Sequence, residues 1–566
     1  MKYLKVLFIV IFRQKLFIIH IMNFIKRILF TAVILAVPFL SSAQEKENET
    51  PVANWQNLDL KDDGVFGIST EKAYKELLKG EKSSTVIVAV IDGGIDEEHE
   101  DLKKVMWVNP KEIPGNGIDD DKNGYIDDIY GWNFIGSAKA NVHYDNLELI
   151  RLINKYNPKY ASALNSTPFT ESERKEFQLY KKLITDYMDK LQSAQMGLQN
   201  TTMIKKYLDE IKAKMDKENP STDDFSSYKP SNDIEGQVLK FVKSELKKRD
   251  FKKFYEELLD GIKYYDAQVK YHLNVDFDPR KDSVGDDYSN SYEHNYGNND
   301  ITGPDAEHGT HVAGIVGAVR NNDLGINGVA NNVRIMAVRT VPDGDERDKD
   351  VANSIRYAVD NGAKILNMSF GKAYSWDKKA VDDAIRYAVS KGALLVHAAG
   401  NDAKNTEKED NFPNRLFQDS TGRTMGTAPA WIEVGASSWK NNEDLVATFS
   451  NFGAKTVDVF APGVKINSTM PGSTYKENDG TSMAAPVVSG LAALIWSYYP
   501  QFTANQIKEI IMNSVTKVDY KVKIKEDGDS KKVNLGDISV SGGVVNAYSA
   551  LKLAEKMSKG NKSRSK

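Results

Sequence analysis

The sequence predicts an α/β fold in which a parallel β-sheet is flanked by helices and an α-helical hairpin or bundle is inserted. Residues 85–91 form a nearly continuous apolar, β-branched run, which is typical of a strand buried on both faces of a parallel sheet. Alternating strands and helices with short connections follow from about residue 303, and this pattern indicates a parallel sheet covered by helices. These are strands at 333–338, 363–368 and 394–398, and helices at 350–360 and 379–390.

The composition is that of a folded protein with a sizeable core. The 566 residues carry 75 Lys and Arg against 79 Asp and Glu, a net charge of −4, so no basic surface points to nucleic acid as a partner. The length corresponds to about two to four structural units. The chain has no Cys, which excludes disulfides, thiolate nucleophiles and Cys-ligated zinc, and only 8 His, so histidine chemistry has few candidates.

The N-terminus, residues 1–43, has the features of a signal peptide. Lys26-Arg27 is a positive segment, residues 28–40 are apolar, and residues 41–43 are small. The stretch before this signal is long, so translation from Met22 is an alternative start. The apolar segment is short for a membrane span, although a retained signal anchor is the other interpretation. We therefore expect export to the periplasm, the cell envelope or the exterior, with no transmembrane segment in the mature chain.

Residues 141–295 are expected to form a mainly helical insertion that ends in a polar loop. Thr170 and Glu173 have the spacing of a capping box at a helix N-terminus. Apolar side chains follow at spacings of three and four, which gives one apolar stripe. They are Phe177, Tyr180, Ile184, Tyr187 and Leu191. Both a solvated spacer and a regulatory element fit this pattern.

Three polar segments carry candidate chemistry. Asp92 follows the predicted strand 85–91, and functional groups in α/β folds gather beyond the carboxyl ends of strands. His308 lies in the first turn of a helix of small residues, and Ser482 lies at the start of another. Taken singly, each has an ordinary interpretation: a turn-forming Asp, a packed or metal-binding His308 and His311 pair, and a Ser that caps a helix.

Taken together, the segments resemble the subtilisin-like serine proteases, the subtilase family. The matching motifs are Val-Ile-Asp92-Gly-Gly-Ile-Asp, His308-Gly-Thr-His-Val-Ala-Gly and Gly-Thr-Ser482-Met-Ala-Ala-Pro, and the order Asp, His, Ser is one of the known triad orders. The resemblance covers roughly residues 55–135 and 296–555. It implies a catalytic domain built from residues 44–140 and 296–555. Outside the resemblance, the basic composition of residues 556–566 predicts a disordered tail.

The resemblance implies a secreted serine endopeptidase that cleaves polypeptides through an acyl-enzyme. Ser482 would attack the scissile carbonyl, His308 would take its proton, and Asp92 would orient the imidazole. Asn401, which follows a predicted strand, would stabilise the oxyanion together with the Ser482 N–H. Two segments would bind the extended substrate and wall its pocket. They are Ser369, Phe370 and Gly371, and Ala399 with Gly400.

An acidic loop has oxygen-bearing residues at positions 1, 3, 5, 7 and 9 of a calcium-binding loop. They are Asp119, Asp121, Asn123, the carbonyl of Tyr125, and Asp127. Gly124 provides the sharp turn, but Tyr130 stands where such loops carry a bidentate Glu. We expect a structural Ca²⁺ here, and an acidic turn without metal is the alternative.

Three other function classes stay open at this point. A silent binding protein on the same scaffold would have no need to retain Asp92, His308, Ser482 and Asn401 together. A serine esterase would carry its nucleophile in Gly-x-Ser-x-Gly, which the sequence around Ser482 lacks. A metal hydrolase would need ligands that the two histidines at 308 and 311 do not complete, because no His-Glu-x-x-His is present.

Overall fold

The computed structural model describes residues 50–419 and 421–564. The predicted signal peptide, residues 1–43, lies outside the described residues. Within the described range the chain forms two compact units, a smaller one of residues 149–277 and a larger one of residues 50–148 and 278–564. The division thus falls inside the range 141–295 expected for the insertion, because the segments at its two ends pack with the larger unit.

The larger unit is built on a seven-stranded sheet of order β2-β3-β1-β4-β5-β8-β9, in which all neighbouring strands are parallel. Its strands are β1 Val86–Asp92, β2 Gly131–Asn133, β3 Val333–Arg339, β4 Ile365–Met368, β5 Leu394–Ala398, β8 Trp431–Ser437 and β9 Val459–Pro462. The α/β fold with a parallel sheet that the sequence predicts is confirmed.

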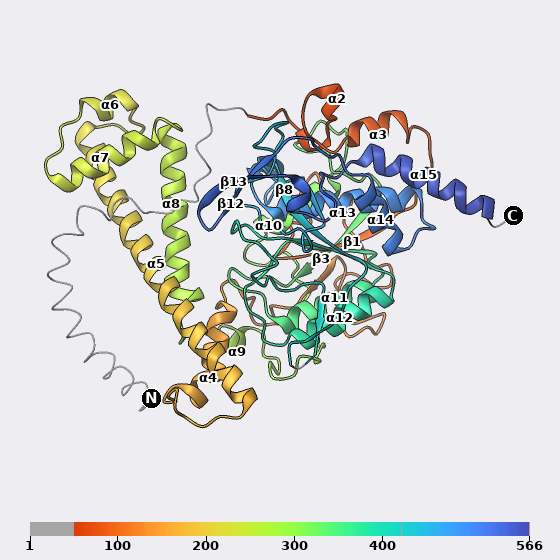
Figure 1. Cartoon of the computed structure of the whole chain (residues 1–566), viewed down its shortest axis with the longest axis horizontal. Coiled ribbons are helices and arrows are strands. Elements are labelled where there is room, and N and C mark those ends of the chain that lie inside the picture. The colour runs from red at the N-terminus through yellow and green to blue at the C-terminus, as the bar shows by residue number, and fades with distance from the viewer. Residues whose placement is uncertain (1–49, 420, 565–566) are drawn as a thin grey trace. The chain divides into compact units, whose positions relative to one another are not determined.

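Helices cover both faces of this sheet, and β1 shows why its sequence is apolar throughout. Val88 and Val90 join one buried cluster, and Ala89 and Ile91 join another, because successive side chains of a strand point to opposite faces. Figure 1 shows α11 Asp348–Asp360 and α12 Lys378–Ser390 on one side of β1 and β3. It shows α13 Thr481–Tyr498 and α14 Ala504–Asn513 on the other side.

The remaining elements of the larger unit are helices and two-stranded hairpins around the sheet. The helices are η2 Trp55–Asn57, α2 Leu60–Asp63, α3 Thr70–Glu76, α9 Arg280–Ser283, α10 Glu307–Gly317, η4 Leu535–Asp537 and α15 Ala547–Arg564. The hairpins are β6 Leu416–Gln418 with β7 Thr424–Thr427, β10 Ile466–Met470 with β11 Thr474–Asn478, and β12 Val522–Glu526 with β13 Asp529–Val533.

The smaller unit is helical and has its own apolar core. Its longest helix, α5, runs for 45 residues, and the predicted capping box of Thr170 and Glu173 is present at its start. Leu208 and Ile211 of α5 pack in one cluster with Val242, Phe254 and Leu258 from later helices. The helices are α4 Glu148–Tyr160, α5 Glu171–Met215, α6 Thr222–Ser227, α7 Asp233–Glu245, α8 Phe251–Ala267 and η3 Gln268–His272.

The expectation of a disordered basic tail at residues 556–566 is wrong for its described part. Helix α15 continues to Arg564, through most of that range. Ala550, Leu551 and Ala554 are buried in the core, and these contacts nucleate a helix that extends beyond them. An ion pair between Lys559 and Glu555, one turn apart, supports the extension.

Among the described residues, α13 is the helix long and apolar enough to cross a membrane. Its position in the fold gives another reason for its composition, because 89% of it is buried inside the protein. Core helices that are surrounded on all sides are apolar all round.

Candidate active site

Three of the predicted site segments lie at the same edge of the sheet. Asp92 is the last residue of β1, Ser369 follows β4, and Asn401 lies three residues after the end of β5. Since β1, β4 and β5 are neighbouring parallel strands, their carboxyl ends meet at one edge. In open α/β sheets this edge is where ligands bind.

Close packing of α10 against β1 brings His308 to Asp92. His308 is the second residue of α10, and Gly309 follows it. A Cβ atom on Gly309 would lie 2.2 Å from the carbonyl oxygen of Gly94 and 3.1 Å from Cβ of Asp92. Only a glycine therefore allows the first turn of α10 to approach the end of β1 this closely.

The imidazole and carboxylate form a direct hydrogen bond. His308 Nδ1 lies 2.7 Å from Asp92 Oδ1, which also accepts the backbone N–H of Gly93 at 2.7 Å. The Asp92 side chain is 4% exposed, and its Oδ2 has no hydrogen-bond partner among the described residues. The His308 side chain is 45% exposed, so the ring is fixed at one nitrogen and open to solvent elsewhere.

The charge of Asp92 sets the basicity of His308. Desolvation lowers the pKa of His308, but the charge and hydrogen bond of Asp92, with a contribution from the charge of Asp305, hold the pKa above its usual 6.5. A carboxylate beside an imidazole stabilises the imidazolium and thereby favours proton uptake. His308 is therefore a stronger base than a free imidazole.

Ser482, the second residue of α13, lies beside the strand end that carries Ser369. Ser482 Oγ donates to the carbonyl of Ser369 at 3.2 Å, and Ser369 Oγ donates to the carbonyl of Ser482 at 2.9 Å. Among the described residues, Ser482 Oγ thus donates to this carbonyl and not to His308. The predicted role of Ser482 as nucleophile does not require that contact before substrate binds, because such hydrogen bonds tighten in the complex.

Asn401 is held at the start of α13 by its side-chain carbonyl. Asn401 Oδ1 accepts the backbone N–H and the hydroxyl of Thr481, each at 2.9 Å. Both of these bonds use the oxygen, which leaves the Asn401 amide N–H groups available as donors. A Cβ on Gly480 would lie 3.4 Å from Asn401 Nδ2 and 3.5 Å from the Ser482 nitrogen, so both donors flank this glycine.

A buried polar chain that was not predicted from the sequence connects α13 to β4. Ser489 Oγ donates to Asn367 Oδ1 at 2.8 Å, and Asn367 Nδ2 donates to Ser369 Oγ at 2.9 Å. Asn367 and Ser489 are fully buried. Because buried polar networks fix a single geometry when every member is satisfied, this chain holds Ser369 and the start of α13 in register.

The two predicted substrate segments leave adjacent strands, and Asn411 lies between them. A Cβ on Gly371 would lie 2.6 Å from Asn411 Oδ1, and Asn411 Nδ2 donates to the carbonyl of Ala399 at 3.2 Å. Asn451 Nδ2 donates to the same carbonyl at 2.8 Å. The carbonyl of Ala399 is thus engaged from two sides. Asn411, to which sequence analysis assigned no role, lies at the space between the segments.

The structure brings together part of the predicted calcium site. Oxygens of Asp119, Asp121 and Glu112 lie within 4.8 Å of one another, and Glu112 was not a predicted ligand. Asn123 Oδ1 accepts the N–H of Tyr125 at 2.8 Å. Asp127 is outside this group, and its carboxylate accepts N–H groups of residues 115–117.

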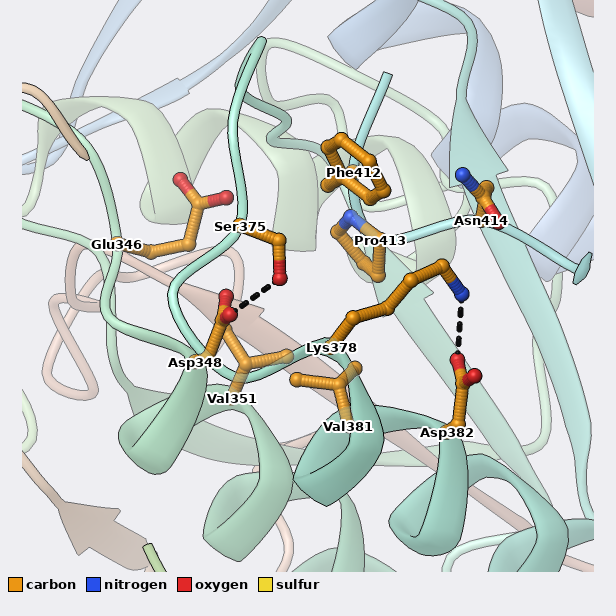
Figure 2. Close-up of a pocket in the computed structure, with 10 residues that line it drawn as sticks. All are labelled: Glu346, Asp348, Val351, Ser375, Lys378, Val381, Asp382, Phe412, Pro413 and Asn414. Carbon is orange, nitrogen blue, oxygen red and sulfur yellow. Dashed lines mark hydrogen bonds and ion pairs between the residues drawn. The ribbon is translucent and has the colours of Figure 1, made fainter. Parts of the chain in front are cut away.

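A small pocket lies beside the segment that follows Asn411 (Figure 2). It is lined by Glu346, Asp348, Val351, Ser375, Lys378, Val381, Asp382, Phe412, Pro413 and Asn414. Figure 2 shows Lys378 paired with Asp382 and Ser375 bonded to Asp348, and the first pair is 2.7 Å apart. These four side chains are thus engaged in internal pairing.

Because of Glu346, which lines this pocket, we expect the free energy of unfolding to depend on pH. Burial raises the pKa of Glu346 to about 8, against the opposing charge of Lys372, from a usual 4.5. Between those two values the folded chain holds a proton that the unfolded chain releases, so the contribution of Glu346 to stability falls as pH rises. We expect Glu346→Gln to be more stable than the parent at pH 9 and about equal near pH 4, measured by urea unfolding across the pH range. A constant difference at all pH values would contradict this assignment.

Curated relatives match about a third of this chain. A thermophilic serine proteinase from Bacillus sp. (strain AK1) is 40% identical over 202 residues, covering 34% of this chain and 42% of the relative. Subtilisin NAT from Bacillus subtilis subsp. natto is 36% identical over 212 residues, covering 37% and 51%. Subtilisin from Bacillus pumilus is 36% identical over 212 residues, covering 37% and 70%. The chain therefore spans about half the length of the first two relatives.

A solved structure of proteases from Pseudoalteromonas arctica is 29% identical, with a TM-score of 0.36, and the match covers 45% of this chain and 74% of that chain. The family model described as the subtilase family matches residues 83–534, which include Asp92, His308, Asn401 and Ser482. This match extends over most of the 566 residues. The chain belongs to the subtilase family.

Proposed function

We propose that this chain is an exported serine endopeptidase that uses Asp92, His308 and Ser482 as its triad. The hydrogen bond of 2.7 Å between His308 and Asp92, at the sheet edge where Ser482 lies in the first turn of α13, is the observation that carries the proposal. Membership of the subtilase family supports the reaction class. The signal-like features of residues 1–43 support export.

The proposed reaction begins with proton transfer from Ser482. As Ser482 Oγ attacks the scissile carbonyl carbon, its proton passes to Nε2 of His308, the nitrogen not bonded to Asp92. The tetrahedral intermediate collapses when His308 gives this proton to the leaving amine, which leaves an acyl-enzyme on Ser482. A water then attacks the acyl carbon, with His308 again accepting and returning the proton, and the carboxylic acid product leaves. Asp92 stays ionised and stabilises the imidazolium.

Asn401 has a separate role in the proposal, as a donor to the oxyanion. Because Thr481 occupies the Asn401 carbonyl oxygen, the amide N–H groups are the free end of that side chain. We expect Asn401→Ala to lower kcat about 10²- to 10³-fold with little change in KM, since the hydrogen bond strengthens only as charge develops. Steady-state kinetics on a peptide substrate measures both constants. A rise in KM with kcat unchanged would instead mean that Asn401 binds substrate in its ground state.

Polypeptides are the proposed substrates. The segments at Ser369–Gly371 and Ala399–Gly400 follow adjacent strands, and such backbone can pair with an extended peptide as an added strand. Extended binding favours unfolded or loop segments of the substrate. The net charge of −4 gives no support to nucleic acid as a partner.

Inhibitor classes test the proposed function directly. Casein hydrolysis by the purified protein should be abolished by a sulfonyl fluoride that reacts with activated serines, and should persist with 1,10-phenanthroline, a zinc chelator. Loss of activity to the zinc chelator alone would support a metal hydrolase. A folded protein that is inert on casein and on unfolded peptides would support a binding scaffold.

We also propose that the acidic loop binds a structural Ca²⁺ through Asp119, Asp121, Asn123 and the carbonyl of Tyr125. The ligand chemistry supports it, because Ca²⁺ prefers carboxylate and carbonyl oxygens at alternate loop positions. The ion would tie a surface loop in a chain that has no Cys for disulfides. It has no part in the peptide-cleavage steps.

A further inference from the structure

We propose that Glu112, which precedes the acidic loop, is a ligand of the calcium ion that the loop binds, and that Asp127 is not. This inference rests on the calcium site proposed above, adds Glu112 to its ligands and explains why Asp127 is not among them. The loop spacing assigns an oxygen to Asp127 and leaves the site without the closing Glu, because Tyr130 stands at that position. The fold supplies the missing carboxylate from the other side of the loop.

Glu112 is buried with one oxygen unsatisfied. Glu112 is 7% exposed, and its Oε1 accepts the backbone N–H of Asp121 at 3.1 Å. Its Oε2 is buried and has no hydrogen-bond partner among the described residues. An ionised carboxylate oxygen that is removed from water without a donor is costly, so this atom calls for a cation.

The neighbouring carboxylates lie at distances that one calcium ion can bridge. Oxygens of Glu112, Asp119 and Asp121 all lie within 4.8 Å of one another. Two oxygens bound to one Ca²⁺ at 2.3–2.6 Å can be at most about 5 Å apart, so this spacing fits a shared ion. The Lys111 ammonium, 3.8 Å from Asp121 and on a side chain that is 71% exposed, is the one cation paired with the group among the ion pairs of the described residues. A solvated lysine screens three carboxylates poorly.

The Asp127 carboxylate binds backbone N–H groups of the preceding segment. Its Oδ1 accepts the N–H groups of Gly115 and Asn116 at 2.8 and 3.2 Å, and its Oδ2 accepts that of Gly117 at 2.8 Å. Its backbone has φ of 52°, a left-handed conformation that turns the chain at this point. The carboxylate therefore closes the loop on the preceding segment. Asp119 also accepts backbone N–H groups at both oxygens, so what separates Asp127 from it is position: among the described residues, the carboxylates that lie within 4.8 Å of one another are those of Glu112, Asp119 and Asp121.

Four variants separate these roles, each made on Ser482→Ala to prevent self-digestion. They are Glu112→Gln, Asp119→Asn, Asp127→Asn and, as a control, Asp120→Asn. Asp120 lies in the same loop, but its Oδ2 accepts N–H groups from Ile113 and Asn116. Calcium affinity is measured by titration calorimetry and by displacement of Tb³⁺ luminescence. We expect Glu112→Gln and Asp119→Asn to weaken calcium binding at this site about tenfold or more, since affinity follows the charge of the ligands.

Thermal unfolding gives a second readout that a purely structural Glu112 would not give. In EDTA, Glu112→Gln should unfold at the same temperature as the parent or higher, because one of three clustered like charges is gone. In calcium it should unfold at a lower temperature than the parent, so the order reverses. Asp127→Asn should unfold at a lower temperature than the parent in both conditions, and calcium should raise its unfolding temperature as much as it raises the parent's. Asp120→Asn should bind calcium as the parent does.

The outcomes distinguish the ligand assignment from the calcium site itself. If Asp119→Asn loses calcium binding while Glu112→Gln binds as the parent does, the loop holds calcium and the assignment of Glu112 is overturned. If both variants bind as the parent does, the calcium site fails and the inference fails with it. If Asp127→Asn loses binding while its loop stays folded, Asp127 is a ligand and that part of the inference is overturned.

Discussion

Replacing Ser482 or His308 by Ala is expected to lower kcat about 2 × 10⁶-fold, the loss measured for these members of the subtilisin triad. Neither side chain accelerates the reaction without the other, because a neutral serine hydroxyl needs an oriented base to become a nucleophile. The double variant should therefore be no less active than either single variant. Rates on a chromogenic peptide over long incubations measure all three.

Circular dichroism and thermal unfolding show whether these variants remain folded. Ser482 Oγ makes one hydrogen bond, to the carbonyl of Ser369, and the His308 side chain is 45% exposed, so neither change removes core packing. Losses that multiply in the double variant would mean that the two residues act independently. That result would contradict a shared triad.

Asp92→Asn is expected to lower kcat/KM about 10⁴-fold and to shift the acidic limb of the plot of kcat/KM against pH. In the parent, kcat/KM falls as pH drops through the His308 pKa, because the protonated ring accepts no proton. Asp92 helps to hold that pKa above 6.5, so its loss moves the limb to lower pH. An Asn at this position also accepts and donates differently, so the ring is held in the wrong tautomer, which accounts for most of the loss in rate.

Asp305→Asn is the matched control for this prediction. Asp305 also raises the pKa of His308 through its charge, but it makes no hydrogen bond to the ring in the described structure. We expect the acidic limb of kcat/KM to shift slightly to lower pH, and the maximal kcat/KM to stay nearly unchanged. If Asp92→Asn behaved like this control, Asp92 would act only through its charge and its orienting role would be wrong.

Much of the sheet and of the candidate site could be predicted from the sequence, because local signals coincide with global ones there. The run at residues 86–91 is apolar on both faces because β1 is covered on both faces, and Asp92 ends it. Gly309 lies where backbone must approach closely, Gly480 has a φ of 155°, and both stand inside the motifs that carry the resemblance. The motifs can be read in the local sequence, although the contact that requires Gly309 comes from a distant segment.

The features that escaped prediction depend on contacts between distant segments. Asn367 and Ser489 form a buried pair across 122 positions, and nothing in either local sequence indicates the other. Glu112 precedes the acidic loop and lies outside its pattern of alternating ligand positions, whereas that pattern predicted Asp127 as a ligand. The extension of α15 beyond residue 556 was missed because the basic residues there hide the few apolar contacts of Ala550 and Leu551 that anchor the helix.

Active-site labelling tests the central claim, that Ser482 is an activated nucleophile, most directly. A fluorophosphonate probe is mixed with the folded protein, and the modified residue is identified by mass spectrometry of the digested adduct. We predict a single adduct on Ser482, much slower labelling of His308→Ala, and none of Ser482→Ala. A folded parent that resists the probe, or equal labelling of Ser482→Ala, would contradict the account.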